Sequence, residues 1–168
     1  GHSAVSLQDK LKYFNAYILS KLRYGLSTIW LATSQRRRVD GFIACCLRRI
    51  LRIPAAFVFK ISNTVVLGRA GVKPFSQQVL KHQLHLLRKA AVTEAGHPLR
   101  KDTFSGSTLV PQIGIFIKRV GRPRQEWTSQ LLREGRARFG EASFQTLLSN
   151  STSGADKRWK VEVEKSFR

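Results

Sequence analysis

The sequence predicts an all-α protein: a small basic helical bundle with an irregular linker and a C-terminal helical extension. Apolar residues recur at helical spacing through most of the chain, whereas glycines and prolines gather in one stretch past the middle. The hydrophobic content is 42%, with ten Phe and three Trp among 168 residues, which is enough to build a core. This composition argues against a chain that is disordered throughout.

The first helix is expected from Leu7 to Leu31. Four of its residues share a narrow apolar sector at about 100° per residue: Leu11, Ile18, Leu22 and Ile29. The aromatic residues beside them widen this surface: Tyr13, Phe14, Tyr17 and Tyr24. Gly25 is a weak point for the helix, because glycine has a low helix propensity.

A second helix is expected from Thr33 or Ser34, which offer an N-cap, to about Ile53, where Pro54 stops it. At about 100° per residue its arginines gather on one face and its apolar residues on the other. The arginines of the basic face are Arg37, Arg38, Arg48, Arg49 and Arg52. The helix is therefore predicted to be amphipathic, with Cys46 on the apolar side and Cys45 among the arginines.

Further helices follow. A short one, capped by Ser62 or Asn63, is expected to end at Gly71, and a longer one to run from Pro74 to about Val92. The longer helix has a broad apolar side opposite a solvated face of basic residues: Lys81, His82, His85, Arg88 and Lys89. Beyond the linker, a helix is expected from about Gln125 to Phe139, and the last twelve residues are expected to form a frayed helix.

Three segments follow from this reading. Residues 1–93 form a helical region, residues 94–117 a linker rich in glycine and proline, and residues 118–168 a basic turn followed by C-terminal helices. The linker holds at most one short strand, at 113–117. The absence of methionine predicts that the chain is a fragment of a longer reading frame.

The charge balance points to a polyanionic partner. Thirty Lys and Arg against ten Asp and Glu give a net charge of +20 and a pI near 11.3, and nucleic acid is the leading candidate. An anionic membrane surface is the weaker alternative, because the basic clusters sit beside glycines and prolines rather than on one long amphipathic helix. No apolar run is long enough for a membrane span, and the two cysteines form no disulfide framework, so a secreted protein is not expected.

No catalytic or metal site is expected. Two adjacent cysteines do not complete a tetrahedral zinc site, and the face that carries His82 and His85 is basic and repels a cation. The carboxylates are scattered, and there is no phosphate-binding glycine loop or nucleophile elbow. We therefore expect no cofactor in this chain.

Two basic clusters are the candidate binding residues. The first is the arginine face of the second helix, whose guanidinium groups suit contacts with phosphates. The second is the stretch KRVGRPR, which contributes Lys118, Arg119, Arg122 and Arg124. This stretch resembles an AT-hook but has Val120 in place of the first arginine, so a basic turn that contacts phosphates is the favoured interpretation.

Six motifs follow one another from about Leu11 to Leu132: KLKYFNAYILSKLRYG, TIWLAT, RRVDGFIACCLRRILRIP, ISNTVVLGRAGVKPF, KHQLHLLRKA and GRPRQEW. Their order is similar to the region after the polymerase palm in reverse transcriptases of non-LTR (LINE-type) retrotransposons. The chain departs from the family in lacking Leu-Gly-His after the leucine-rich helix. It also has no Asp-Asp, because the family's catalytic aspartates belong to the upstream palm.

The resemblance implies a thumb and post-thumb segment that grips the template and primer without sequence preference. The arginines of the second helix would contact backbone phosphates, and the basic turn at 118–124 would hold template RNA or target DNA. Its partners would be an RNA template, an RNA–DNA hybrid or target DNA, together with the palm and fingers of the same polypeptide. The parent RNA-directed DNA polymerase would need Mg²⁺ and would act in the nucleus and cytoplasm.

A different class of function stays open on the same residues. A self-standing basic helical module would bind RNA or DNA structurally, with no polymerase ancestry. The reading frame upstream discriminates the two hypotheses, because an aromatic-x-Asp-Asp motif shortly before residue 1 supports the polymerase, whereas a nearby start codon supports the module.

Overall fold

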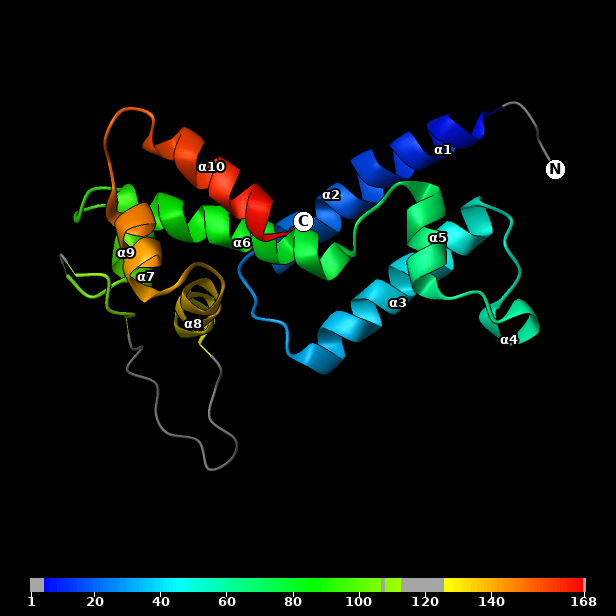
Figure 1. The fold of residues 1–168 in the computed structure, drawn as a ribbon, viewed down its shortest axis with the longest axis horizontal. Coiled ribbons are helices and arrows are strands. Elements are labelled where there is room, and N and C mark those ends of the chain that lie inside the picture. The colour runs from blue at the N-terminus through cyan, green and yellow to red at the C-terminus, as the bar shows by residue number, and fades with distance from the viewer. Residues whose placement is uncertain (1–4, 107, 113–125, 168) are drawn as a thin grey trace. The chain divides into compact units, whose positions relative to one another are not determined.

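The computed structural model describes residues 5–106, 108–112 and 126–167. The all-α prediction is confirmed: the regular elements of the described residues are helices, and extended pairing is limited to one bridge, Phe104 to Pro111. The chain forms two compact units, Gly1–Leu80 and Lys81–Arg168. Figure 1 shows the order of the helices. In the described ranges no helix has both the length and the apolar character needed to cross a membrane.

Unit 1 begins with one continuous helical rod built from three segments: α1 (Leu7–Tyr13), a π-helical segment (Phe14–Leu19) and α2 (Ser20–Leu26). Ser6 caps the start, because its hydroxyl oxygen accepts a hydrogen bond from the Asp9 backbone N–H at 3.1 Å. Gly25 lies inside α2 without breaking it. The rod ends at Leu26, five residues before the predicted end at Leu31.

The π-helical segment changes which side of the rod is buried. Phe14 and Leu19 are both buried although they lie five residues apart, a spacing that fits the wider π turn rather than an α turn. The prediction that Ile18 and Ile29 share the buried sector is wrong, since both are exposed. The π segment inserts one extra residue, which rotates the register by about 100° at that point, although Leu22 beyond it still packs against the core as predicted.

The second helix, α3, spans Thr33–Ile50 and follows an N-cap at Ala32, whose backbone N–H donates to Gln35 Oε1 at 2.9 Å. It ends three residues before the predicted Ile53. The Ile53 N–H returns to the Arg48 carbonyl at 2.9 Å, and Arg52 between them has a left-handed backbone with φ 54°. This arrangement is a Schellman ending, in which Arg52 occupies the position that usually holds glycine.

Two short helices and the start of a longer one complete unit 1: α4 (Ala56–Phe59), α5 (Asn63–Ala70) and α6 (Phe75–Val92). Ser62 caps α5, and Gly71 ends it with φ 64°, as the sequence predicts. α3 packs against α5 (Figure 1). The core of the unit gathers residues from the rod, α3, α5 and α6: Phe14, Leu19, Ile43, Leu47, Val66, Leu67, Phe75 and Val79.

Unit 2 continues along α6 and adds α7 (Pro98–Thr103), α8 (Trp127–Phe139), α9 (Glu141–Ser149) and α10 (Ala155–Ser166). An aromatic cluster holds the C-terminal helices together, with Phe139, Phe144 and Trp159 ring centroids 5.9 to 6.3 Å apart. The frayed C-terminal helix of the prediction is instead packed, because Trp159 and Val163 of α10 are buried.

The linker and the unit boundary differ from the sequence prediction. Residues 94–117 contain the helix α7, capped by His97, whose Nδ1 accepts from the Leu99 N–H at 3.1 Å. The division between the units falls at Leu80, inside α6, rather than in that stretch. A helix that serves two cores keeps its apolar periodicity unbroken, so the sequence gives no local sign of the division. The predicted strand at 113–117 lies outside the described residues.

Candidate nucleic-acid interface

One side of α3 carries a continuous row of exposed residues. Arg38, Phe42, Cys45 and Arg49 follow one another at spacings of four, three and four residues, and all four are exposed. Residues at these spacings lie on the same side of a helix. The two guanidinium groups are thus borne about 16 Å apart along the axis, at 1.5 Å per residue, with an aromatic ring and a thiol between them. We call this row the α3 stripe.

Two further arginines lie at the margins of the α3 stripe. Arg37 is exposed near its start, and Arg52 is exposed just past the end of the helix. None of the four exposed arginines forms an ion pair with a carboxylate in the described residues. Their positive charge is therefore not compensated within the part of the fold that is described.

The only acidic residue of α3 is engaged elsewhere. Asp40 accepts hydrogen bonds from Ser76, from the backbone N–H to Oδ1 at 2.8 Å and from the hydroxyl to Oδ2 at 2.6 Å. Ser76 lies in the first turn of α6, where backbone N–H groups lack helical partners and a carboxylate is favoured by the helix dipole. Asp40 thus joins α3 to α6 and leaves the α3 stripe basic.

Arg48 does not lie on this exposed surface. Its side chain is only 6% exposed, and its guanidinium donates to the carbonyls of Pro54 and Ile61 and to the amide oxygen of Asn63. The prediction that Arg48 belongs to a solvent-exposed basic face is therefore wrong. The reason is tertiary: the chain after α3 folds back over this side of the helix, and its part-buried carbonyls accept hydrogen bonds from Arg48.

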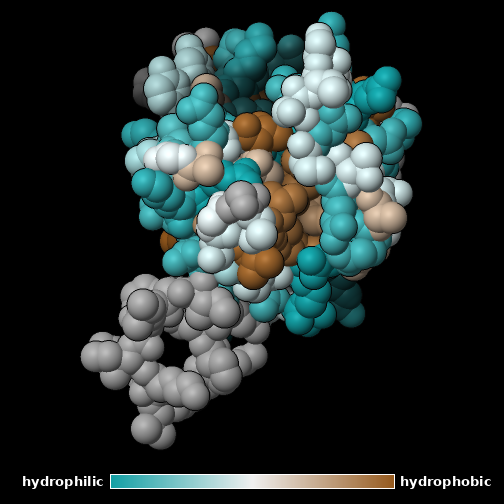
Figure 2. All heavy atoms as spheres, turned by 90° about the vertical axis from the view of Figure 1, so that its left-hand side faces the viewer, coloured by the Kyte–Doolittle hydropathy of each residue, from teal (hydrophilic) through white to brown (hydrophobic). Residues whose placement is uncertain are grey.

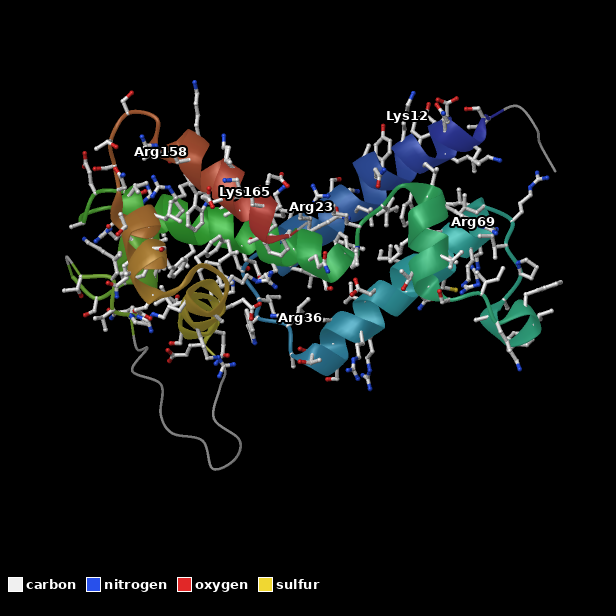
Figure 3. All side chains as sticks on the ribbon, in the orientation of Figure 1. Lys12, Arg23, Arg36, Arg69, Arg158 and Lys165 are labelled. Atoms are coloured by element: carbon white, nitrogen blue, oxygen red, sulfur yellow. The ribbon has the colours of Figure 1, made fainter. Side chains whose placement is uncertain are left out.

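Arg36 is a basic residue that the sequence prediction omitted. Its guanidinium carbon lies 4.4 Å from the centre of the Trp30 ring, and its Nε donates to the Leu31 carbonyl at 2.9 Å. Figure 3 shows Arg36 at the N-terminal end of α3. The cation–π contact fixes the connection between α2 and α3. A tryptophan six residues before an arginine is too weak a signal to predict the contact.

The second predicted cluster, Lys118, Arg119, Arg122 and Arg124, lies outside the described residues, so its role stays a prediction. In the part of the chain that is described, no group of three His, Cys, Asp or Glu side chains converges. Cys45 is exposed and Cys46 is half-buried, so the two thiols differ in access. Burial and the neighbouring Cys45 raise the pKa of the Cys46 thiol, which keeps it protonated and unreactive.

Unit 2 has a hollow of about 320 Å³ with a mixed polar and apolar lining. Figure 2 faces this end of the molecule and shows hydrophobic side chains gathered in a depression among hydrophilic ones. The apolar lining comes from Leu109, Val110, Leu132, Phe144 and Leu148. Among the described residues that line this hollow, Arg136 is the only titratable one. The lining therefore does not indicate a reaction or a ligand.

A histidine in unit 2 has its protonation state set by packing. The Trp159 ring N–H donates to His85 Nδ1 at 3.0 Å, so this nitrogen must be unprotonated. Burial lowers the pKa of His85, and the positive charges of Lys81, His82 and Lys160 lower it further, while Glu164 opposes them. His85 is therefore neutral in the fold at neutral pH.

Acidification is expected to weaken unit 2 through His85. His85 has a lower pKa in the folded chain than in the unfolded chain, where it is about 6.5. Below about pH 6.5 the unfolded chain therefore binds a proton at His85 more readily than the folded chain does. The free energy of unfolding falls as the pH drops from 6.5 through the folded pKa. His85→Gln removes the titration but keeps an acceptor for Trp159. Urea unfolding between pH 8 and pH 5 should show a steeper loss in the natural chain than in His85→Gln. Equal slopes for the two proteins would contradict this assignment.

Comparison with protein-family models, with curated proteins and with solved structures finds no match to this chain.

Proposed function

We propose that this chain binds nucleic acid through the α3 stripe, gripping the phosphate backbone of a template and primer without sequence preference. In this proposal it is the thumb and post-thumb part of a non-LTR retrotransposon reverse transcriptase. The palm and fingers of the same polypeptide supply the catalytic aspartates and bind Mg²⁺, and the complex acts in the nucleus and cytoplasm. In this proposal the chain contributes phosphate contacts, and the catalytic groups belong to the palm.

The observation that carries the proposal is the uncompensated charge of one helix side. Arg37, Arg38, Arg49 and Arg52 are exposed and have no carboxylate partner in the described residues, while Asp40 is bound to Ser76. Guanidinium groups spread along about 16 Å of a helix suit a row of phosphates rather than one small anion. The net charge of +20 favours the same class of partner.

Phosphate contacts also fit the mechanical task of a thumb. A polymerase must hold a duplex of any sequence and let it advance, which requires contacts that do not read bases. Arg48 contributes indirectly, because it fixes the chain that follows α3. It is therefore excluded from the set of proposed contacts.

The double replacement Arg38→Gln/Arg49→Gln is expected to weaken binding to RNA–DNA hybrids of unrelated sequence alike. Each lost phosphate contact should make the dependence of log affinity on log salt shallower by about 0.9, so the two together should reduce the slope by roughly two units. Fluorescence anisotropy with labelled hybrids across a salt series measures both quantities. Arg48 stays unchanged, because its loss would disturb the fold.

The matched control is Lys89→Gln/Lys101→Gln, which removes the same charge at exposed positions of unit 2, outside α3. This control should keep the salt slope of the natural chain. A slope that falls equally in both double variants would mean that net charge alone drives binding, and a slope that falls in neither would mean that the α3 stripe is merely solvated.

Cys45 offers an independent footprint of the same surface. It lies on the α3 stripe between Phe42 and Arg49 and is exposed. In a Cys46→Ala background, a bound hybrid should slow alkylation of Cys45 by iodoacetamide several-fold, and high salt should restore the rate. An alkylation rate that saturating hybrid leaves unchanged would place the bound nucleic acid elsewhere.

A further inference from the structure

We infer that the N-terminal rod of unit 1 carries a second nucleic-acid site, for a single strand, where unpaired bases stack on Tyr13 and Tyr17 and a phosphate enters an adjacent basic hollow. This inference rests on the proposed function in that both take nucleic acid. It uses a different surface and a different chemical form of the ligand.

The π-helical segment leaves two tyrosines facing outward. Tyr13 is 58% exposed and Tyr17 is 61% exposed, although both belong to the rod whose Phe14 and Leu19 enter the core. Their ring centroids lie 6.2 Å apart with an interplanar angle of 28°, so the two rings form a paired platform. Neither hydroxyl has a hydrogen-bond partner in the described residues. The fold therefore makes no use of these exposed ring faces.

Beside the tyrosines lies an open hollow of about 580 Å³ with basic walls. Lys12, Arg23 and Lys73 line it, and no carboxylate does. Figure 3 shows Lys12 and Arg23 on the same helical rod. Asp9 is 3.8 Å from the Lys12 ammonium in an exposed pair, which is worth little in water.

The guanidinium of Arg23 is held in position at this hollow. Its Nη2 donates to Gln78 Oε1 at 2.8 Å, and the Gln78 amide nitrogen donates in turn to the Lys73 carbonyl at 3.0 Å. The Arg23 Nε is buried and has no partner in the described residues. Arg23 is thus already ordered before any anion arrives, which lowers the entropic cost of binding.

The platform and the hollow are neighbours on the rod. Lys12 and Ala16 line the hollow, and each directly precedes one of the tyrosines, about 100° round the helix axis. A strand that crosses the rod therefore meets positive charge and aromatic faces in succession. Alternating cationic and aromatic contacts are the pattern by which proteins bind single strands without sequence preference.

The aromatic component commits the site to unpaired bases. In a duplex the faces of the bases are stacked on one another, so a protein ring reaches them only where the strand is open. Both RNA and DNA present these faces, so the stacking contacts do not distinguish the two sugars. The expected ligand is therefore a single strand of either sugar, such as the unpaired template next to a primer end.

The test compares a labelled 12-nucleotide oligo(U), the matching oligo(dT) and a blunt RNA–DNA hybrid by fluorescence anisotropy. Tyr13→Leu/Tyr17→Leu keeps apolar, helix-favouring side chains and should lower affinity for both single strands on the order of tenfold per lost stacking contact. Affinity for the hybrid should stay unchanged. Lys12→Gln should weaken single-strand binding as well, whereas Lys21→Gln, on the same rod outside the hollow, should not.

Tyr24→Leu is the matched aromatic control, because Tyr24 is exposed on the same rod but lies outside the stacked pair. Single-strand affinity that survives in Tyr13→Leu/Tyr17→Leu, or that falls equally in Tyr24→Leu, would overturn the inference. Hybrid binding that is lost in Arg38→Gln/Arg49→Gln would still support the proposed function in that case. A natural chain that binds neither form of nucleic acid would overturn both. Matching far-UV circular dichroism confirms that the variants are folded.

Discussion

Replacing Arg88 by leucine should lower the free energy of unfolding of unit 2 by about 3–5 kcal/mol. The sequence placed Arg88 on a solvated basic face, which is wrong, since it is only 3% exposed. Its guanidinium donates to the carbonyls of Leu147, of Leu148 at 3.0 Å and of Asn150 at 2.5 Å. These carbonyls end α9, where the helix leaves acceptors without partners, so Arg88 acts as a C-terminal cap supplied by another helix.

The loss of stability in Arg88→Leu comes from the unpaired carbonyls rather than from the broken ion pair of Arg88. Asp156 accepts from Arg88 at 3.2 Å, but its side chain is 77% exposed, so water replaces that partner readily. The carbonyl oxygens of Leu147, Leu148 and Asn150 lose the guanidinium donors, and leucine offers none. The Arg88 guanidinium also lies 5.7 Å from the Trp159 ring centre, a contact that leucine keeps only as apolar packing.

Urea unfolding followed by tryptophan fluorescence measures this effect. A Trp30→Phe background removes the unit 1 tryptophan, so that the signal comes from Trp127 and Trp159 in unit 2. Lys89→Gln is the control, because it removes one positive charge from the next, exposed position of α6. A loss below 1 kcal/mol in Arg88→Leu, or an equal loss in Lys89→Gln, would refute the capping role.

Gly135→Ala should destabilise unit 2 by about 2–3 kcal/mol, although alanine is the better helix former. Gly135 is buried inside α8, and a Cβ built on it would overlap Cζ of Phe144. Real Cβ atoms do not approach another atom so closely, so the Phe144 ring must move. That ring packs against Phe139 and Trp159, and its displacement opens the aromatic cluster of α8, α9 and α10.

Two helical glycines of unit 1 provide the comparison. Gly25 and Gly41 have no atom within 4 Å of the position that a Cβ would take. Alanine at either position should raise stability by about 0.5–1 kcal/mol through helix propensity alone. The midpoint of thermal unfolding, measured by circular dichroism, should therefore fall in Gly135→Ala and rise in Gly41→Ala.

A second-site change separates the clash from other causes. Phe144→Leu in the Gly135→Ala background should recover part of the lost stability, because the smaller side chain leaves room for the new methyl group. The same Phe144→Leu change in the natural chain should only destabilise, because it leaves a cavity. Purely additive effects of the two changes would show that the Gly135–Phe144 contact does not limit the packing.

Much of this fold could be predicted from the sequence alone, because it depends on interactions between residues close in the chain. Apolar periodicity placed α3, α5, α6 and α8 within a few residues, and Ser62 and Gly71 mark the ends of α5 because a hydroxyl cap and a left-handed residue act within one turn. The exposure of Arg38 and Arg49 followed from the same periodicity. Each of these features depends on residues that are close in sequence.

Tertiary contacts decided the rest. A helical wheel places Arg48 and Arg88 on the surface. In the fold both are buried, because they donate hydrogen bonds to the carbonyls of Ile61 and Leu148, which are distant in sequence. Ile18 is exposed in the π segment between Phe14 and Leu19, and the apolar periodicity of the sequence does not predict this segment. A helical wheel assigns faces by angle alone, whereas the cost of an unpaired buried carbonyl depends on which chain segment arrives there. The sequence alone therefore determined α3, α5, α6 and α8 and the overall charge, and the tertiary structure decided which basic residues remain available to a ligand.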